Sequence, residues 1–171
     1  MKLMTIDNGP HGHAGALMPN GEVLDLAALA LVDPFARLVP QTLRGILDVG
    51  SEALDLVKRC IERAGKLSRE EAQAKLILRA FADTSLLAPI PDPRLILSVG
   101  TNYGRHLKEM GGTPPPTYPT AFIKPMSSLT GSGKPILIPP QCPDMIDYEG
   151  EFTYVFGKPC HNVSEAEAMD Y

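Results

Sequence analysis

The chain has few of the features that mark membrane-spanning, disulfide-stabilised or nucleic-acid-binding proteins. Its 171 residues include only three cysteines, Cys60, Cys142 and Cys160, too few and too scattered for a disulfide framework or a zinc knot. No apolar run approaches the roughly 20 residues that cross a bilayer. A net charge of −4 gives no reason to expect nucleic acid or an anionic membrane as a partner. Polar residues follow the first methionine too soon for a signal peptide, so we expect a cytoplasmic protein.

Proline, by contrast, is frequent and unevenly distributed. Most of the 17 prolines fall within residues 89–143, where turns and short extended pieces must replace helices. Alternate prolines make residues 86–93 a stiff linker and the best candidate for a domain boundary. We therefore predict an α+β protein with a small N-terminal domain over residues 1–85 and a second domain over residues 86–171.

The predicted N-terminal domain begins with a β-hairpin. Residues 1–6 and 14–18 have the composition of short strands, and a third strand is predicted at 22–26. Asn20 and Gly21 separate the last two, and both residue types favour the positive φ angles of a two-residue hairpin turn.

Two helices are predicted after the hairpin. Ser51 and Gly65 bound the first, whose apolar residues fall on one face. Ser68 and Glu71 form a capping box that opens the second, with an apolar stripe that continues to Phe81. These helices have the composition of a scaffold, and no catalytic motif stands out in residues 1–85.

Short strands are predicted again beyond the boundary, at 95–99, 121–124, 136–138 and 147–156. A second capping box, Ser164 with Glu167, then opens a helix that has only about two turns before Tyr171. Isolated short helices are marginally stable in water, so we expect that Tyr171 is not a natural domain end.

The predicted strand at 147–156 carries two neighbouring acidic side chains. Glu149 and Glu151 lie on one face, roughly 7 Å apart at two residues' rise. The opposite face is aromatic and therefore a core face, with Tyr148, Phe152, Tyr154 and Phe156. Two close carboxylates repel unless a proton or a cation lies between them, and oxygen ligands suit Mg²⁺ or Mn²⁺. The alternative is a solvated acidic strand face.

A histidine and a glutamate follow the first of these strands. If residues 106–109 form a helical turn, His106 and Glu109 share a face at positions i and i+3. A carboxylate beside an imidazole orients the ring and raises its basicity, which makes a usable general base. The alternative is an exposed His–Glu pair on the surface.

Taken together and in order, these motifs resemble those of the fumarylacetoacetate hydrolase family. The resemblance covers about residues 86–171, and the motifs that carry it are residues 100–112, 122–125, 127–128, 136–139 and 147–151. It implies that the second domain is the first part of a mixed β-sandwich roll, and that the full-length protein is a homodimer.

The resemblance also implies roles for five residues. Glu149 and Glu151 match two of the ligands for Mg²⁺ or Mn²⁺, and the family's third ligand, an aspartate, belongs to a segment beyond residue 171. His106 and Glu109 match the pair that activates water. Lys124 is expected near the site, where a cation stabilises developing negative charge. This chain alone is therefore expected to be inactive.

The implied reaction is the hydrolysis of a C–C bond in a 2,4-dioxo acid, such as an acylpyruvate or fumarylacetoacetate. The metal would bind the carboxylate and 2-oxo oxygen, His106 would activate water, and the cation would stabilise the departing enolate. The same enolate serves decarboxylation of oxaloacetate-like acids and keto–enol isomerisation, and the motifs do not choose among these reactions. A non-catalytic, truncated subunit is the alternative of a different class.

Two further motifs are interpreted as structural. His11 and His13 could bind a metal, but no carboxylate lies beside them in the sequence, and we predict an exposed loop. Residues 131–134 have the composition of a phosphate-binding loop without its spacing, and they precede a predicted strand rather than a helix. We predict a turn there.

Overall fold

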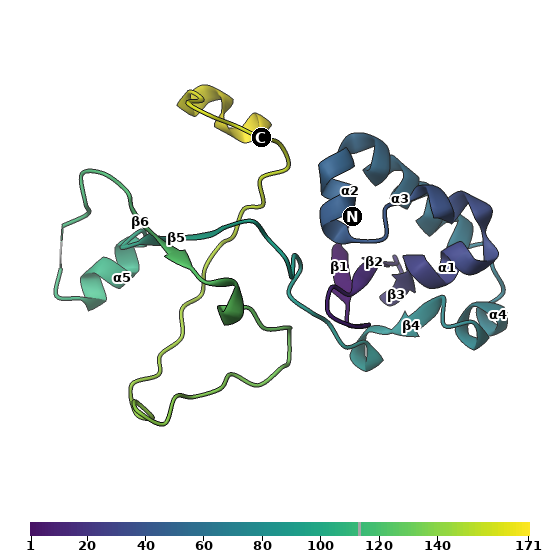
Figure 1. Ribbon diagram of the computed structural model, residues 1–171, viewed down its shortest axis with the longest axis horizontal. Helices are drawn as coiled ribbons and strands as arrows, with labels where there is room; N and C mark the ends of the chain where they lie inside the picture. Colours follow the sequence, from purple (N-terminus) through teal and green to yellow (C-terminus); the bar gives the residue numbers. More distant parts are fainter. Residues whose placement is uncertain (113) are drawn as a thin grey trace. The chain divides into compact units, whose positions relative to one another are not determined.

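The computed structural model describes residues 1–112 and 114–171 (Figure 1), and the chain divides into two compact units. One unit combines Met1–Ile90 with Thr130–Tyr171, and the other is Pro91–Leu129. Helices and small antiparallel sheets occur together, which confirms the predicted α+β class. The sandwich roll and the domain boundary at residue 85 stay predictions.

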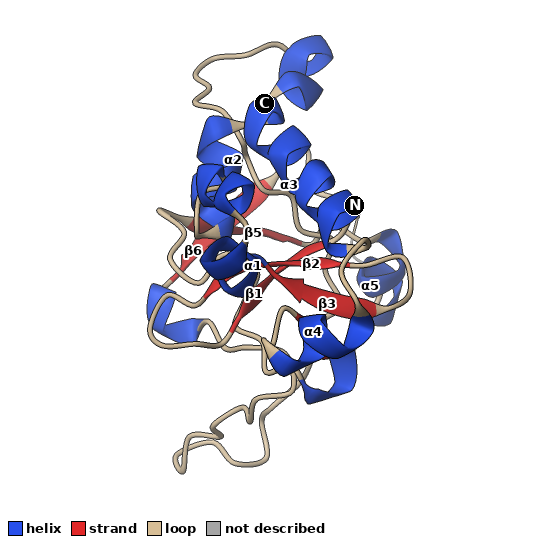
Figure 2. Cartoon of the chain, turned by 90° about the vertical axis from the view of Figure 1, so that its right-hand side faces the viewer, coloured by secondary structure: helices blue, strands red, loops and turns tan. Residues whose placement is uncertain are grey.

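A four-stranded antiparallel sheet forms the centre of the N-terminal part (Figure 2). Its strands, in spatial order, are β1 (Leu3–Ile6), β2 (His13–Leu17), β3 (Glu22–Asp25) and β4 (Leu78–Ala80). The predicted hairpin is confirmed, since Gly21 has a φ of 85° and the Asn20 side chain accepts a hydrogen bond from the Glu22 N–H at 3.1 Å. The predicted two-residue turn is wrong, because Asn20 does not have a positive φ and the Gly21 N–H donates to the Met18 carbonyl.

A short extended segment, residues 85–87, runs along the free edge of β1. Leu86 is paired antiparallel with Ile6. The Asp7 N–H donates to the Ser85 carbonyl at 2.9 Å, and the Leu87 N–H donates to the Thr5 carbonyl at 3.0 Å. The first residues of the predicted linker are thus hydrogen-bonded to the N-terminal sheet.

Helices cover this sheet and complete its core. Four α-helices belong to this part: α1 (Leu26–Val32), α2 (Leu43–Val49), α3 (Ser51–Ala64) and α4 (Arg69–Ala74). Two 3₁₀ helices, Pro34–Leu38 and Phe81–Asp83, lie between elements. Helix α3 ends at Gly65 as predicted, and one stripe of it is buried, with Ala53, Val57, Cys60 and Ala64. Burial raises the pKa of the Cys60 thiol to about 11, with the Asp33 charge contributing, so this thiol stays protonated.

The second predicted helix is wrong in its C-terminal half. Ser68 caps it as predicted, but α4 ends at Ala74 and Leu76 has a φ of 55°. Leu78 then pairs with Leu24 as part of β4. Ile77 is fully buried there, so strand pairing and burial prevail over a helical spacing of apolar residues.

Gly12 is required by the close approach of β2 to β1. Its φ is 56°, and a side-chain carbon there would collide with the Ile6 carbonyl oxygen and lie 2.7 Å from Thr5 Cγ2. We expect Gly12→Ala to lower the free energy of unfolding by about 1–3 kcal/mol in a urea titration. Gly65→Ala is the matched control, because Gly65 has helical dihedrals and its nearest atoms would be 3.5 Å away. Equal stability of the two variants would contradict this account.

The unit Pro91–Leu129 contains a two-stranded antiparallel sheet. It is built from β5 (Ile96–Gly100) and β6 (Thr120–Lys124), and both predicted strands are confirmed. Helix α5 (Gly104–Glu109) lies in the connection between them, and a 3₁₀ helix, Met126–Ser128, follows β6.

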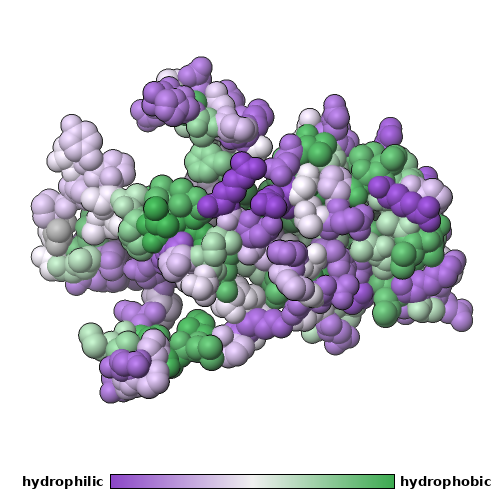
Figure 3. Space-filling model, in the orientation of Figure 1, coloured by the Kyte–Doolittle hydropathy of each residue, from purple (hydrophilic) through white to green (hydrophobic). Residues whose placement is uncertain are grey.

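Residues 130–171 contain no strand in the structure, so two strand predictions are wrong. The residues at 136–138 and 147–156 are not paired, and their apolar side chains lie at the surface (Figure 3). Tyr148 is 92% exposed, where the prediction made its face part of a core. A strand needs a hydrogen-bonded neighbour, and none of the described residues supplies one to these segments. The Ser164–Glu167 capping box is present, but the element that it opens is a 3₁₀ helix, Glu165–Asp170.

Candidate functional site

Helix α5 carries His106 and Glu109. Its buried residue is Leu107, which is 6% exposed, whereas the side chains of His106 and Glu109 are exposed. The two lie three residues apart on one short helix, as predicted. The Glu109 carboxylate lies 3.9 Å from the Arg105 guanidinium, so its charge is paired with that cation. Both side chains are accessible to a ligand, and their catalytic role stays a prediction.

Lys124 is the last residue of β6 and pairs with Ile96 of β5. Its ammonium nitrogen lies 5.7 Å from the centre of the Phe122 ring, two residues earlier on the same face of the strand. This cation–π contact favours one direction of a long side chain without neutralising its charge. Lys124 therefore presents a positive charge from a hydrogen-bonded strand, as its predicted role requires.

Glu149 and Glu151 lie on the extended segment at 147–156, and both side chains are exposed. The space around Gly150 between them is open, with no atom near the position of an added side chain. The Phe152 and Tyr154 rings meet edge to face, with centroids 5.0 Å apart. That Glu149 and Glu151 lie on one face stays a prediction.

The predicted residues fall into two groups, and each group belongs to a different unit. His106, Glu109 and Lys124 lie in Pro91–Leu129, and the two glutamates lie in Thr130–Tyr171. Among residues 1–112 and 114–171, no three metal-binding side chains gather in one place. Exposed carboxylates are the donors that Mg²⁺ or Mn²⁺ prefers, so the chemistry of this pair fits such an ion. Two of them supply only part of a coordination sphere.

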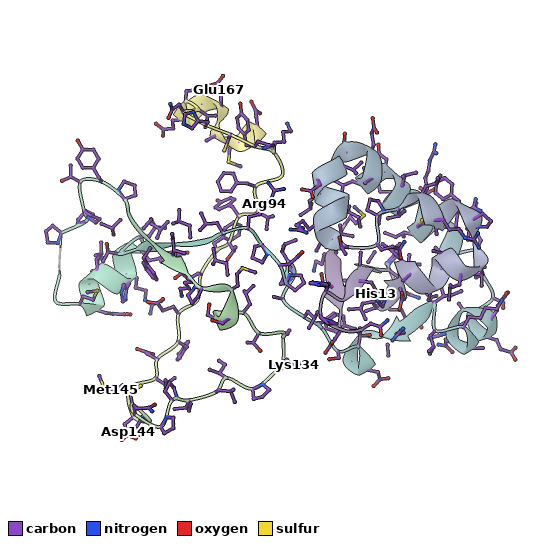
Figure 4. The ribbon with its side chains drawn as sticks, in the orientation of Figure 1. His13, Arg94, Lys134, Asp144, Met145 and Glu167 are labelled. Carbon is purple, nitrogen blue, oxygen red and sulfur yellow. The ribbon has the colours of Figure 1, made fainter. Side chains whose placement is uncertain are left out.

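A buried charged cluster in the N-terminal sheet was missed from the sequence. His13 of β2 (labelled in Figure 4) is 8% exposed and lies beside Asp25 of β3, so the prediction of an exposed loop is wrong for His13, whereas His11 is exposed as predicted. The His13 Nε2 atom is 2.9 Å from Asp25 Oδ1, close but not aligned as a hydrogen bond. The Arg79 guanidinium donates to Asp25 Oδ2 at 2.6 Å, and the Ala28 N–H donates to Asp25 Oδ1 at 2.9 Å.

The pKa of the buried Asp25 carboxyl is lowered. Burial alone would raise this pKa, but His13, the Ala28 N–H and the Arg79 charge together stabilise the carboxylate more strongly. Asp25 also caps α1, and an aspartate directly before an apolar run was the available sequence signal. The cluster joins three strands and a helix, and its contacts are those of a structural element.

Comparison with known proteins identifies the family. The family model described as fumarylacetoacetate (FAA) hydrolase C-terminal matches residues 95–171. The chain belongs to the fumarylacetoacetate hydrolase family. This confirms the resemblance that the motifs indicate, and the matched range includes all five predicted site residues.

Several relatives of this family member are oxaloacetate tautomerases. A mitochondrial one from Xenopus laevis is 33% identical over 155 residues, which are 91% of this chain and 43% of the relative. One from Homo sapiens is 28% identical over 138 residues, 81% of this chain and 40% of the relative. One from Bos taurus is 41% identical over 76 residues, 44% of this chain and 34% of the relative. The chain thus spans less than half the length of these curated relatives.

The Xenopus laevis match extends the similarity well beyond the family model. It covers 91% of this chain, whereas residues 95–171 are the part that the model matches. None of the helices in residues 1–112 and 114–171 has the length and hydrophobicity that a membrane span requires.

Proposed function

We propose that the complete polypeptide is a divalent-metal-dependent enzyme that acts on a small 2-oxo acid. The first candidate reaction is the keto–enol tautomerisation of an oxaloacetate-like acid. One observation carries it: over 91% of its own length, the chain is 33% identical to an oxaloacetate tautomerase. The proposed metal is Mg²⁺ or Mn²⁺, held in part by Glu149 and Glu151.

Hydrolysis of a C–C bond in a 2,4-dioxo acid is the second candidate. The placement of His106 and Glu109 on one exposed helical turn favours it, because hydrolysis requires a base that activates water. Both reactions pass through an enolate, so one set of residues serves either. The substrate and the access of water to the site determine which of the two reactions occurs.

Each residue has a proposed task in this chemistry. His106 accepts a proton, from the carbon beside the 2-oxo group in tautomerisation or from water in hydrolysis. Glu109 orients His106 in the complete site, where it must exchange part of its interaction with Arg105. Lys124 stabilises negative charge on the substrate. A bound divalent cation would supply Lewis-acid stabilisation of the enolate oxygen.

Two assays on the complete polypeptide with Mn²⁺ test the proposal. In the first assay, we expect faster conversion of enol to keto oxaloacetate, which is monitored as the loss of enol absorbance. The second assay measures the cleavage of an acylpyruvate. Acceleration of the first alone would support the tautomerase, and acceleration of the second alone would support the hydrolase. Neither reaction responding to Mn²⁺ would contradict the proposed function. Homodimer formation and a cytoplasmic location are further proposals, which gel filtration and cell fractionation test.

His106→Ala is expected to lower kcat by about 100-fold or more, since general-base catalysis contributes about 10²–10⁴-fold. Lys124→Ala should cause a milder loss, because the metal provides part of the same charge stabilisation. His11→Ala is the control: it removes an exposed imidazole outside the matched residues and should leave kcat unchanged. A His106→Ala variant with normal kcat in both assays would contradict the assignment of the base.

A further inference from the structure

The turn at residues 131–134 is attached to the N-terminal sheet by an ion pair. The Lys134 N–H donates to the Gly131 carbonyl at 3.1 Å, and Gly133 has a φ of 74°, which confirms the predicted turn. The Lys134 ammonium then donates to Asp7 Oδ2 at 2.7 Å, directly after β1 (Figure 4 labels Lys134). Ser85 donates to the same oxygen at 3.3 Å. The hydrogen bond from Lys134 is the main cause that lowers the pKa of Asp7.

A second contact lies at the start of the same turn. A side-chain carbon on Gly131 would collide with the Leu86 carbonyl oxygen and lie 3.1 Å from Leu87 Cα. These backbone atoms have little freedom to move, because Leu86 is paired with Ile6 and the Leu87 N–H donates to Thr5. Only glycine fits at position 131 while the turn stays against this backbone.

The two contacts reinforce each other. A surface ion pair alone contributes little, because water and salt screen it. Here the partners belong to one chain, which raises their effective concentration, and the glycine contact fixes the turn beside the charge. Both contacts lie at the edge of the sheet that residues 85–87 complete.

We propose that residues 131–134 form a docking turn, through which the N-terminal sheet holds the start of the segment that carries Glu149 and Glu151. Asp7, Gly131 and Lys134 are then positioning residues for the metal-binding pair. This last role rests on the proposed function, whereas the docking itself does not. The N-terminal part thereby contributes to the site without supplying a ligand.

Hydrogen exchange in the complete polypeptide tests the docking without metal or substrate. The amides at positions 134 and 87 are the probes, since the first donates within the turn, to the Gly131 carbonyl, and the second donates at the edge of the sheet, to the Thr5 carbonyl. We expect Lys134→Asp to raise the exchange of the backbone amide at position 134 by about 10-fold, after correction for the intrinsic rate of the new residue, since local opening governs exchange. The reversed pair, Asp7→Lys with Lys134→Asp, should restore protection. Failure of the reversed pair to do so would overturn the docking turn.

Matched glycines give an independent measurement. Gly131→Ala should raise exchange at Lys134 as well, whereas Gly157→Ala should not, because the space around Gly157 is open. Equal exchange in the two variants would also overturn the proposal.

A Mn²⁺ titration of the same variants tests the positioning role. We expect Lys134→Asp to weaken the apparent Mn²⁺ affinity on the order of 10-fold, as loss of supporting contacts does in metal sites, and the reversed pair to restore it. If exchange responds while Mn²⁺ affinity stays unchanged, the positioning role is overturned and the docking stands. If the unsubstituted protein binds no Mn²⁺, the proposed function fails and the exchange result still decides the docking.

Discussion

Glu149→Gln is expected to lower the Mn²⁺-dependent turnover of the complete polypeptide by at least about 100-fold. Contacts that only support a metal ligand cost about 10–100-fold when they are lost, and removing a ligand's charge costs at least as much. Glutamine keeps the size of the side chain, so the folding of this exposed segment should not change. The measurement is kcat/KM over a range of Mn²⁺ concentrations, where excess metal should recover part of the activity.

The control for this prediction is Glu165→Gln. Glu165 is also an exposed glutamate of the matched residues 95–171, but it lies in the 3₁₀ helix after the acidic segment. It should retain full turnover and an unchanged dependence on Mn²⁺. If Glu149→Gln behaves as this control does, the two glutamates are not ligands and the solvated acidic face is the correct interpretation.

Asp25→Ala is expected to lower the free energy of unfolding by about 3–5 kcal/mol, the usual cost of removing one partner of a buried ion pair. Arg79 would lose its carboxylate partner, and the Ala28 N–H at the start of α1 would lose its cap. Asp25→Asn should cost less, because its amide oxygen still accepts from Ala28. Urea unfolding measures both variants, and Asp55→Asn, at an exposed carboxylate of α3, is the control.

The effect of Asp25 should depend on pH in a defined direction. The pKa of Asp25 is lower in the folded state than in the unfolded chain. Its contribution to stability is therefore present above the unfolded value of about 3.9 and is lost as the pH falls through the folded value. The stability difference between the native protein and Asp25→Asn should shrink from pH 7 towards pH 3. A difference that stays constant over this interval would contradict an ionised Asp25.

Local signals were sufficient for much of the N-terminal fold. The Asn20 side chain and the positive φ of Gly21 define a turn, and α3 has one face of apolar residues that ends at a glycine. Such signals lie within a few residues of the element that they define. The stretch after Ala74 shows their limit, because β4 forms through pairing with β3, about 50 residues earlier in the chain.

The candidate site could be predicted only in part. His106 and Glu109 lie on one helix because their spacing is a local property. The strand assigned to Glu149 and Glu151 depends on neighbours, and a pattern of alternating residues does not provide them. For His13 the error is the reverse, because a buried side chain was predicted to be exposed. It lies beside Asp25 on the neighbouring strand, and nothing in the residues next to it in the sequence indicates that contact.

The pairing of residues 85–87 with β1 determines where the gene can be divided. If the chain is divided before Leu86, the N-terminal fragment loses the residue that pairs with Ile6, and the edge of its sheet is left uncovered. A fragment that ends after Ile90 keeps the hydrogen bonds of Thr5 to Leu87 and to the Pro89 carbonyl. A split version of the protein, or a fusion that inserts another domain, should therefore be joined after Ile90, with the proline-rich stretch that follows serving as the natural spacer.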